Sequence, residues 1–210
     1  FAACKGHVVT SSIEHHAVLE ASKLHEHTLV APNEKGMVSA ESVKKAITPT
    51  TEIVSIQLAN NELGTIQPLR DIAEVVRAER ARRAEVGDPR PIYFHSDASQ
   101  GLGQIDVHVS RLGVDALTIN AGKLYGPKQV AALWTDRFVR LTPLVYGGGQ
   151  EKGIRSGTEN VAGVIGFAKA IQLAVEHTNG EAKRLIVLRD YLQRELIARF
   201  PNAVVSGAGK

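Results

Sequence analysis

The sequence predicts an α/β protein built around a mainly parallel β-sheet. Two observations support this prediction. Short β-rich runs alternate with amphipathic stretches along most of the chain, which is the rhythm of strand–helix–strand units. The 210 residues, of which 43% are hydrophobic and 22% charged, are also enough to bury a substantial core without disulfides.

The individual elements follow from local patterns. Residues 17–25 form the first expected helix. A long helix is expected over residues 68–86, because Asp71 lies in its first turn and apolar residues recur after it at helical spacing. The Gly-Asp-Pro-Arg-Pro segment at residues 87–91 then interrupts the chain before the next strand. The expected strands are, in order, His7–Thr10, Thr51–Leu58, Ile92–His95, Asp115–Ile119 and Ala131–Trp134.

The last third of the chain has a different character. Residues 165–177 and 181–200 show two long helical patterns with no strand between them, and residues 203–206 are expected to form a further strand. The chain begins at Phe1 and stops in a turn-like stretch, so we expect a fragment. We divide it into a large domain over 1–150, a connecting segment with a linking helix over 151–180, and the start of a smaller domain over 181–210.

Composition limits the class of protein. No apolar run approaches the roughly 18 residues of a membrane helix, and no signal peptide is apparent. The single cysteine, Cys4, excludes a disulfide framework within the chain. Charges of both signs alternate to give a net charge of +3, so neither nucleic acid nor a membrane is expected as a partner. We therefore expect a soluble, cytoplasmic protein.

Polar clusters follow the expected strands, where ligands bind in open parallel sheets. Among these residues, Lys123 lies in a tight, apolar, Gly-bounded loop, which predicts a desolvated and nucleophilic amine. Asp97, at another strand end, is a suitable counter-ion for a pyridinium nitrogen. The alternative from spacing alone is a partly buried ion pair between Asp97 and Lys123 without a catalytic role.

Two further features have alternative interpretations. His15 suits stacking on a planar cofactor, acid–base chemistry or helix capping, and the neighbouring histidines lack partners that would complete a metal site, so no metal is predicted. The glycine run at residues 147–150 and the Arg-Ser-Gly-Thr segment at residues 155–158 suit a grip on a phosphate or carboxylate. A flexible linker is the alternative for these two segments.

Taken together, the motifs resemble those of cysteine desulfurases, in the class V, fold-type I family of aminotransferases that use pyridoxal 5′-phosphate. The motifs occur in the family's order over essentially the whole chain: Glu14–Val18, Ala59–Pro68, His95–Gln100, Lys123–Pro127 and Gly147–Asn160. The resemblance implies a large domain with a mainly parallel, seven-stranded sheet flanked by helices, followed by the start of a small α+β C-terminal domain.

The resemblance also implies roles for single residues. Lys123 would bind the cofactor covalently and later move protons at the substrate Cα, and Asp97 would pair with the pyridinium nitrogen. His15 would stack on the ring, while Asn61 and Gln100 would hydrogen-bond near its phenolic oxygen. A further residue, Thr158, would reach the phosphate of the neighbouring subunit's cofactor in a homodimer.

The sequence departs from the family pattern beside the lysine. The family usually has a histidine directly before the lysine and a serine two residues further back, both on the phosphate, whereas this chain has Gly122 and Asn120. A side-chain hydrogen bond from Asn120 is still expected. The family's phosphate-binding turn, its sulfur-accepting cysteine and its substrate-binding arginine are expected outside residues 1–210, and Cys4 is expected to be a buried core residue.

The resemblance implies conversion of L-cysteine to L-alanine, with sulfur passed on as a persulfide for iron–sulfur clusters or tRNA thiolation. A sulfur-accepting scaffold protein is a possible partner. Selenocysteine lyase shares the same motifs, and the arginine-rich helix with the insertion at residues 87–91 is similar to that branch. A catalytically inactive dimerisation or scaffold module is the hypothesis from a different class.

Overall fold

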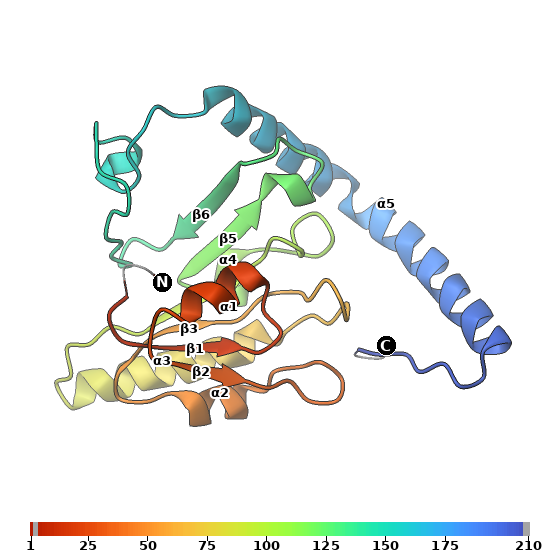
Figure 1. The fold of residues 1–210 in the computed structure, drawn as a ribbon, viewed down its shortest axis with the longest axis horizontal. Helices are drawn as coiled ribbons and strands as arrows, with labels where there is room; N and C mark the ends of the chain where they lie inside the picture. Colours follow the sequence, from red (N-terminus) through yellow and green to blue (C-terminus); the bar gives the residue numbers. More distant parts are fainter. Residues whose placement is uncertain (2–3, 208–210) are drawn as a thin grey trace.

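A six-stranded sheet runs through the protein, as a computed structural model of residues 1 and 4–207 shows (Figure 1). The strand order is β2-β1-β3-β4-β5-β6; the first five are parallel and β6 is antiparallel to β5. The prediction of a mainly parallel sheet is confirmed, although the described residues form six strands rather than seven. The strands are β1 (His7–Ser11), β2 (His27–Val30), β3 (Thr51–Ser55), β4 (Tyr93–Asp97), β5 (Ala116–Asn120) and β6 (Ala131–Thr135).

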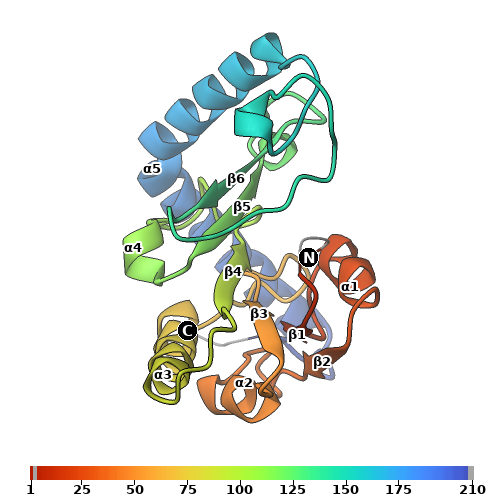
Figure 2. The same ribbon diagram turned by 90° about the vertical axis from the view of Figure 1, so that its left-hand side faces the viewer.

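Helices cover the sheet unequally. In Figures 1 and 2, α2 and α3 lie on one face of the sheet and α1 on the other, while α5 crosses the end that carries β5 and β6. The sequence patterns predict α1 and α3 but miss the short elements β2, α2 and α4. The helices are α1 (His16–Ser22), α2 (Ala40–Ala46), α3 (Leu69–Glu85), α4 (Val109–Leu112) and α5 (Val161–Arg199), with 3₁₀ turns η1 (Ala121–Lys123) and η2 (Glu151–Gly153).

The main core lies between the sheet and the face covered by α2 and α3. Val54 and Phe94 project from the sheet and belong to the same buried cluster as Leu69, Ile72 and Val76 of α3. Burying each such side chain contributes about 1.5–3 kcal/mol. This layer fixes the strand ends on which the candidate site is built.

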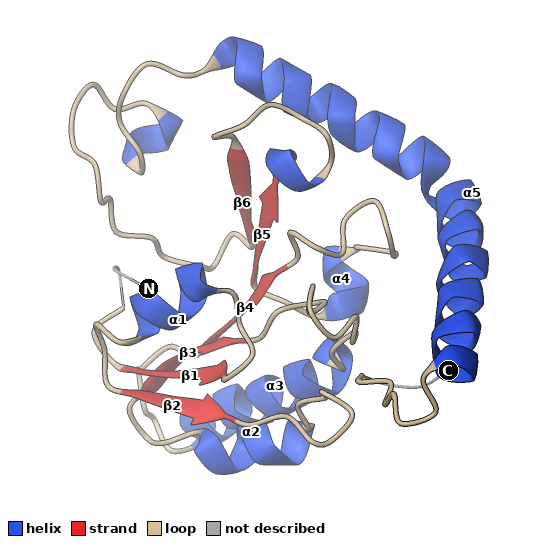
Figure 3. Ribbon diagram, turned by 45° about the vertical axis from the view of Figure 1, so that its right-hand side comes forward, coloured by secondary structure: helices blue, strands red, loops and turns tan. Residues whose placement is uncertain are grey.

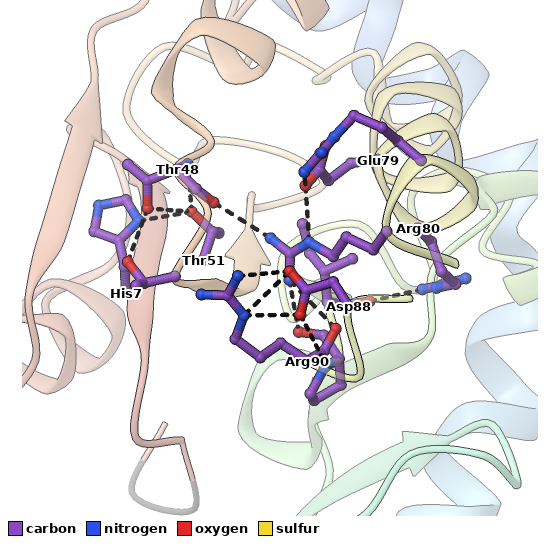
Figure 4. A network of polar contacts seen from close by, with 12 residues as sticks. His7, Thr48, Thr51, Glu79, Arg80, Asp88 and Arg90 are labelled. Atoms are coloured by element: carbon purple, nitrogen blue, oxygen red, sulfur yellow. Dashed lines mark hydrogen bonds and ion pairs between the residues drawn. The ribbon is translucent and has the colours of Figure 1, made fainter. Parts of the chain in front are cut away.

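A buried arginine anchors the segment between α3 and β4, within the polar network in which Figure 4 labels Thr48 and Glu79. Arg83 is 2% exposed; it donates to Glu79 at 2.8 Å and to the carbonyls of Pro91 and Thr48 at 3.1 and 3.3 Å. Hydrogen bonds from Arg82 and Arg83, only partly opposed by burial, lower the pKa of Glu79 to about 2. Arg83 thus ties α3 to the carbonyls of Arg90 and Pro91, at the end of the segment over residues 87–91.

Two expectations for the last third are wrong. The two helical patterns form one continuous helix, α5, which bends along its length in Figure 3. No proline interrupts it, and within it the Thr178 hydroxyl donates to the Ala174 carbonyl at 2.7 Å, a bond that is associated with bent helices. Residues 203–206 form no strand, because no sheet edge pairs with them. The division into domains stays a prediction.

Candidate active site

The predicted polar clusters meet at one edge of the sheet. Strands β1, β3, β4 and β5 are parallel neighbours, so their carboxyl ends lie together. In the pairing of β4 with β5, Asp97 is opposite Thr118, two residues before the end of β5 at Asn120. The backbone at Asp97 therefore lies close to the start of the turn that carries Lys123.

Asp97 ends β4 and lines a cavity of about 530 Å³ on the face opposite the main core. Its side chain is half-buried rather than fully buried, and its Oδ1 accepts a hydrogen bond from the Ser99 amide at 2.9 Å. This bond shapes the turn that leads to Gln100, which is also half-buried. The backbone thus fixes one carboxylate oxygen of Asp97, and the residue lines the cavity.

A histidine that was given no role of its own in the sequence analysis lies beside Asp97 in this cavity. The His95 ring bridges Ser55 and Thr118, with 2.8 Å from each ring nitrogen to a hydroxyl, and so joins β3, β4 and β5. Burial lowers its pKa to about 4, against the opposing charge of Asp97, so the ring is neutral near pH 7. The feature of the sequence that could have identified His95 as a site residue is its position as a polar residue inside a strand.

Lys123 corrects one prediction. It ends the 3₁₀ turn η1 and is exposed, so the expected desolvation of its amine is wrong. The apolar residues of the loop do not enclose Lys123. Ala121 and Leu124 are instead buried in one cluster with Phe167 of α5. The side-chain oxygen of Asn120 accepts a hydrogen bond from the Gly122 amide at 2.8 Å and so caps the turn. This oxygen is therefore already occupied by a backbone contact.

Lys123 and Asp97 do not form the alternative ion pair. Among the residues that the structure describes, no salt bridge or hydrogen bond joins them, and Lys123 lines a separate hollow of about 450 Å³ with Tyr125 and Lys169 of α5. The tertiary structure therefore brings together the strand ends that carry these side chains, but not the side chains themselves.

His15 and Asn61 occupy the neighbouring strand ends. His15 is the N-cap residue of α1, and its Nδ1 accepts from the Ala17 amide at 3.1 Å, so the helix-capping interpretation is confirmed. Asn61 lies in a turn closed by Asn60, whose side chain accepts from the amides of Glu62 and Leu63 at 2.9 and 2.7 Å. Both His15 and Asn61 are exposed, with their backbones held by local bonds.

Thr158 comes from a different part of the chain. It is exposed and lies between η2 and α5, in a segment closed on itself by hydrogen bonds. The buried Ser156 hydroxyl accepts from the Gly149 amide at 3.3 Å, and the Gln150 carboxamide accepts from the Gly157 amide at 3.0 Å. These bonds make the glycine-rich segment an ordered turn rather than an unstructured linker.

Cys4 is buried, as predicted. Its thiol donates to Glu52 at 3.3 Å, and burial together with this bond raises its pKa to about 11. Because the thiolate is the nucleophilic form, Cys4 is poorly suited to accept sulfur. Among the described residues, no group of three or more His, Cys, Asp or Glu side chains is arranged to hold a metal ion. No helix there is long and apolar enough to cross a membrane.

Comparisons with known proteins agree with this architecture. The model of the family "Aminotransferase class-V" matches residues 2–201. The cysteine desulfurases IscS of Clostridium botulinum (strain Hall) and Dictyoglomus turgidum are 41% and 42% identical over 206 residues; each match covers 96% of this chain, and 49% and 50% of those proteins. The chain thus spans about half the length of the curated relatives it matches.

Solved structures give the same result. A NifS-like protein superposes with a TM-score of 0.83 at 37% identity, covering 92% of this chain and 52% of its own. The NifS-like protein of Rickettsia africae superposes with a TM-score of 0.86 at 31% identity, covering 98% of this chain and 55% of its own. Because the family model extends over nearly the whole sequence and the fold agrees with these structures, the chain belongs to the class V aminotransferases, a family that depends on pyridoxal 5′-phosphate.

Proposed function

We propose that this chain is the cofactor-binding part of a cysteine desulfurase that uses pyridoxal 5′-phosphate. The observation that carries the proposal is the placement of Asp97 and Lys123 after neighbouring parallel strands, at the edge of the sheet where ligands bind. Curated relatives at 36–42% identity are named cysteine desulfurases, which favours this function over selenocysteine lyase and over an inactive scaffold.

The residues at this edge fit the chemistry of the cofactor. An aldehyde requires an amine, and Lys123 is exposed with no ion pair among the described residues, so its side chain is free to turn toward β4. A pyridine nitrogen requires an anion, and the Asp97 carboxylate faces an open cavity. Bound pyridoxal phosphate supplies an electron sink that stabilises negative charge on the substrate.

The chain's own groups then have defined tasks. The Lys123 amine would hold the cofactor and would move a proton at the substrate Cα, while Asp97 would pair with the pyridine nitrogen. The His15 imidazole would stack on the ring, and Asn61 and Gln100 would hydrogen-bond near the phenolic oxygen. The Asn120 oxygen already caps η1, so only its amide NH₂ remains as a donor for the phosphate.

In the proposed reaction, L-cysteine loses its sulfur and becomes L-alanine, while an accepting thiol becomes a persulfide. Cys4 is the only cysteine and is buried, so we expect the accepting thiol to come from outside residues 1–210. Transfer to a scaffold protein for iron–sulfur clusters, or to tRNA thiolation, would follow. A homodimer is part of the proposal because the family resemblance has Thr158 reach the phosphate of the neighbouring subunit's cofactor. Thr158 is exposed, in a segment apart from the strand ends. The proposed location is cytoplasmic, which rests on composition.

The test is spectroscopic. Titration of the purified chain with pyridoxal phosphate is expected to give a visible absorbance band from the lysine-bound cofactor. Lys123→Ala is expected to abolish the band, whereas Lys128→Ala, which removes another exposed lysine of the same loop, is expected to retain it. A band that persists in Lys123→Ala, or no band in the wild-type chain, would contradict the proposal.

A further inference from the structure

A buried carboxyl group ties the loop of His15 to the loop of Asn61. Glu14 lies between β1 and α1 and is 5% exposed. Its Oε1 accepts from the Ser11 hydroxyl at 2.5 Å and from the Gln57 amide, just beyond β3, at 2.9 Å. One oxygen therefore joins two segments that are 43 positions apart in the sequence.

A second set of bonds runs between the same two loops. The Ile13 carbonyl accepts from the Gln57 side-chain amide at 2.5 Å and from the Asn60 side-chain amide at 3.0 Å. The oxygen of Asn60 closes the turn that contains Asn61. The position of His15 is thus coupled to that of Asn61 through Glu14 and its neighbours.

The other oxygen of Glu14 is unusual. Oε2 is buried and has no hydrogen-bond partner among the described residues. The charge of Asp97, at the end of β4, contributes to raising the pKa of Glu14 but less than burial does, while Ser11 and Gln57 contribute hydrogen bonds from β1 and the β3 loop. On α1, Glu20 pairs with Lys23 at the surface, and His15 and His16 are exposed.

We infer that Glu14 is a positioning residue whose buried carboxyl group holds the His15 and Asn61 loops together. The inference rests on the proposed function for the assignment of His15 and Asn61 to the cofactor. The coupling between their two loops does not depend on that function. A proton on Oε2 removes the repulsion between two carboxylates at one strand edge. Loss of that proton places a negative charge on a buried carboxyl group and weakens the link between the two loops.

The pH range follows from the environment of Glu14. Burial raises its pKa to about 7, against the hydrogen bonds from Ser11 and Gln57. Ionisation of this one group therefore falls near neutral pH, where most glutamates are already charged. The two loops are expected to change together over that range.

The experiment is an NMR pH titration of the cofactor-free chain. The backbone amides of residues 13–15 and 58–62 are expected to shift with one shared midpoint near pH 7. Glu14→Gln keeps an oxygen acceptor without a titrating group and is expected to remove the shared transition. Glu20→Gln, on the exposed face of α1, is the matched control and is expected to leave the transition unchanged.

Two results would overturn the inference: a transition in only one of the two loops, or a midpoint in the ordinary range of glutamate. Both are measured on the wild-type chain, so the inference is tested even where a variant fails to fold. In a second measurement, Glu14→Ala is expected to bind pyridoxal phosphate about tenfold more weakly than the wild type, as expected for a lost buried hydrogen-bond network, with Glu14→Gln in between. No cofactor binding by the wild-type chain would contradict the proposed function, while the shared transition would still decide the role of Glu14.

Discussion

The strands β1 to β5 with α2 and α3 differ sharply from the region formed by β6 and α5. In the first region the sheet and helices share a continuous buried cluster that includes Phe94, which is 1% exposed. In the second, the buried residues of α5 are Gly163 and Phe167, and the first four residues of β6 are exposed. The first region is therefore held by a closed core, whereas the second is held by the pairing of β6 with β5 and by a small buried cluster of Ala121, Leu124, Val130 and Phe167.

This difference shows where the candidate site obtains its rigidity. The loops of His15, Asn61 and Asp97 all leave the closed region, whereas the turn of Lys123 lies where the two regions meet. We expect the first three loops to hold their geometry in the chain by itself. The Lys123 side chain has more freedom to adjust when a ligand binds.

The largest expected effect is on the core. Phe94→Ala leaves a cavity in a fully packed cluster and is expected to lower the free energy of unfolding by about 3–5 kcal/mol. The matched change Phe200→Ala, at a residue that is 61% exposed beyond α5, is expected to change it by less than about 0.5 kcal/mol. Urea unfolding measures both, and equal losses would contradict the division into two regions.

A pH effect is expected next. The folded pKa of Glu14 is raised from 4.5 to about 7, so its contribution to stability is fully present below about pH 4.5 and is lost as the pH rises through about 7. The loss amounts to roughly 3 kcal/mol. Glu14→Gln is expected to flatten this part of the stability–pH curve. Glu176→Gln on the exposed face of α5 serves as the control, and a curve that stays unchanged in Glu14→Gln would refute the assignment.

A smaller effect is expected at the arginine pair of α3. Arg83→Ala leaves the Pro91 carbonyl without this donor and the Thr48 carbonyl with only the Thr51 amide, and it is expected to cost about 1–3 kcal/mol. Arg82→Ala removes an exposed partner of the same Glu79 and is expected to cost clearly less than Arg83→Ala. Thermal unfolding of the two variants side by side measures this difference. A larger loss of stability in Arg82→Ala than in Arg83→Ala would contradict the prediction.

The smallest effect concerns helix caps in the two regions. Ser39 caps α2 with a 3.0 Å bond to the Ser42 amide, and Asn160 caps α5 with a 3.0 Å bond to the Gly163 amide. Alanine at Ser39 is expected to lower global stability by about 1 kcal/mol. Alanine at Asn160 is expected to speed amide exchange in α5 with little change in global unfolding. Hydrogen exchange measures both effects. If the chain unfolded as a single cooperative unit, the Ser39 and Asn160 variants would lose the same global stability, which would contradict the prediction.

Much of the fold was predictable because its signals are local. Apolar strand runs and the amphipathic α3 pattern depend on residues close in sequence, and they located five of six strands. The missed elements β2 and α2 are short, and β2 is only partly buried, so their patterns were weak. The false strand at 203–206 shows the converse limit, because a β-prone run forms no strand without a neighbour to pair with.

The candidate site was predictable in part for the same reason. Asp97, Asn120 and Lys123 were found because polar residues directly follow apolar runs, and Cys4 was correctly expected to be buried. The exposure of Lys123 was not predictable, because the apolar residues of its loop pack against Phe167, which lies more than 40 positions further on. The roles of His95 and Glu14 were missed because their partners come from neighbouring strands.

The sequence by itself determined five of the six strands, the helices α1 and α3, the kinds of chemical group at the strand ends and the family resemblance, because each depends on residues close along the chain. Only the tertiary structure decided which of those groups are buried, neutral or free. Burial and hydrogen bonding depend on segments far apart in sequence, and in Glu14 and His95 it is these contacts that set the charge of the group.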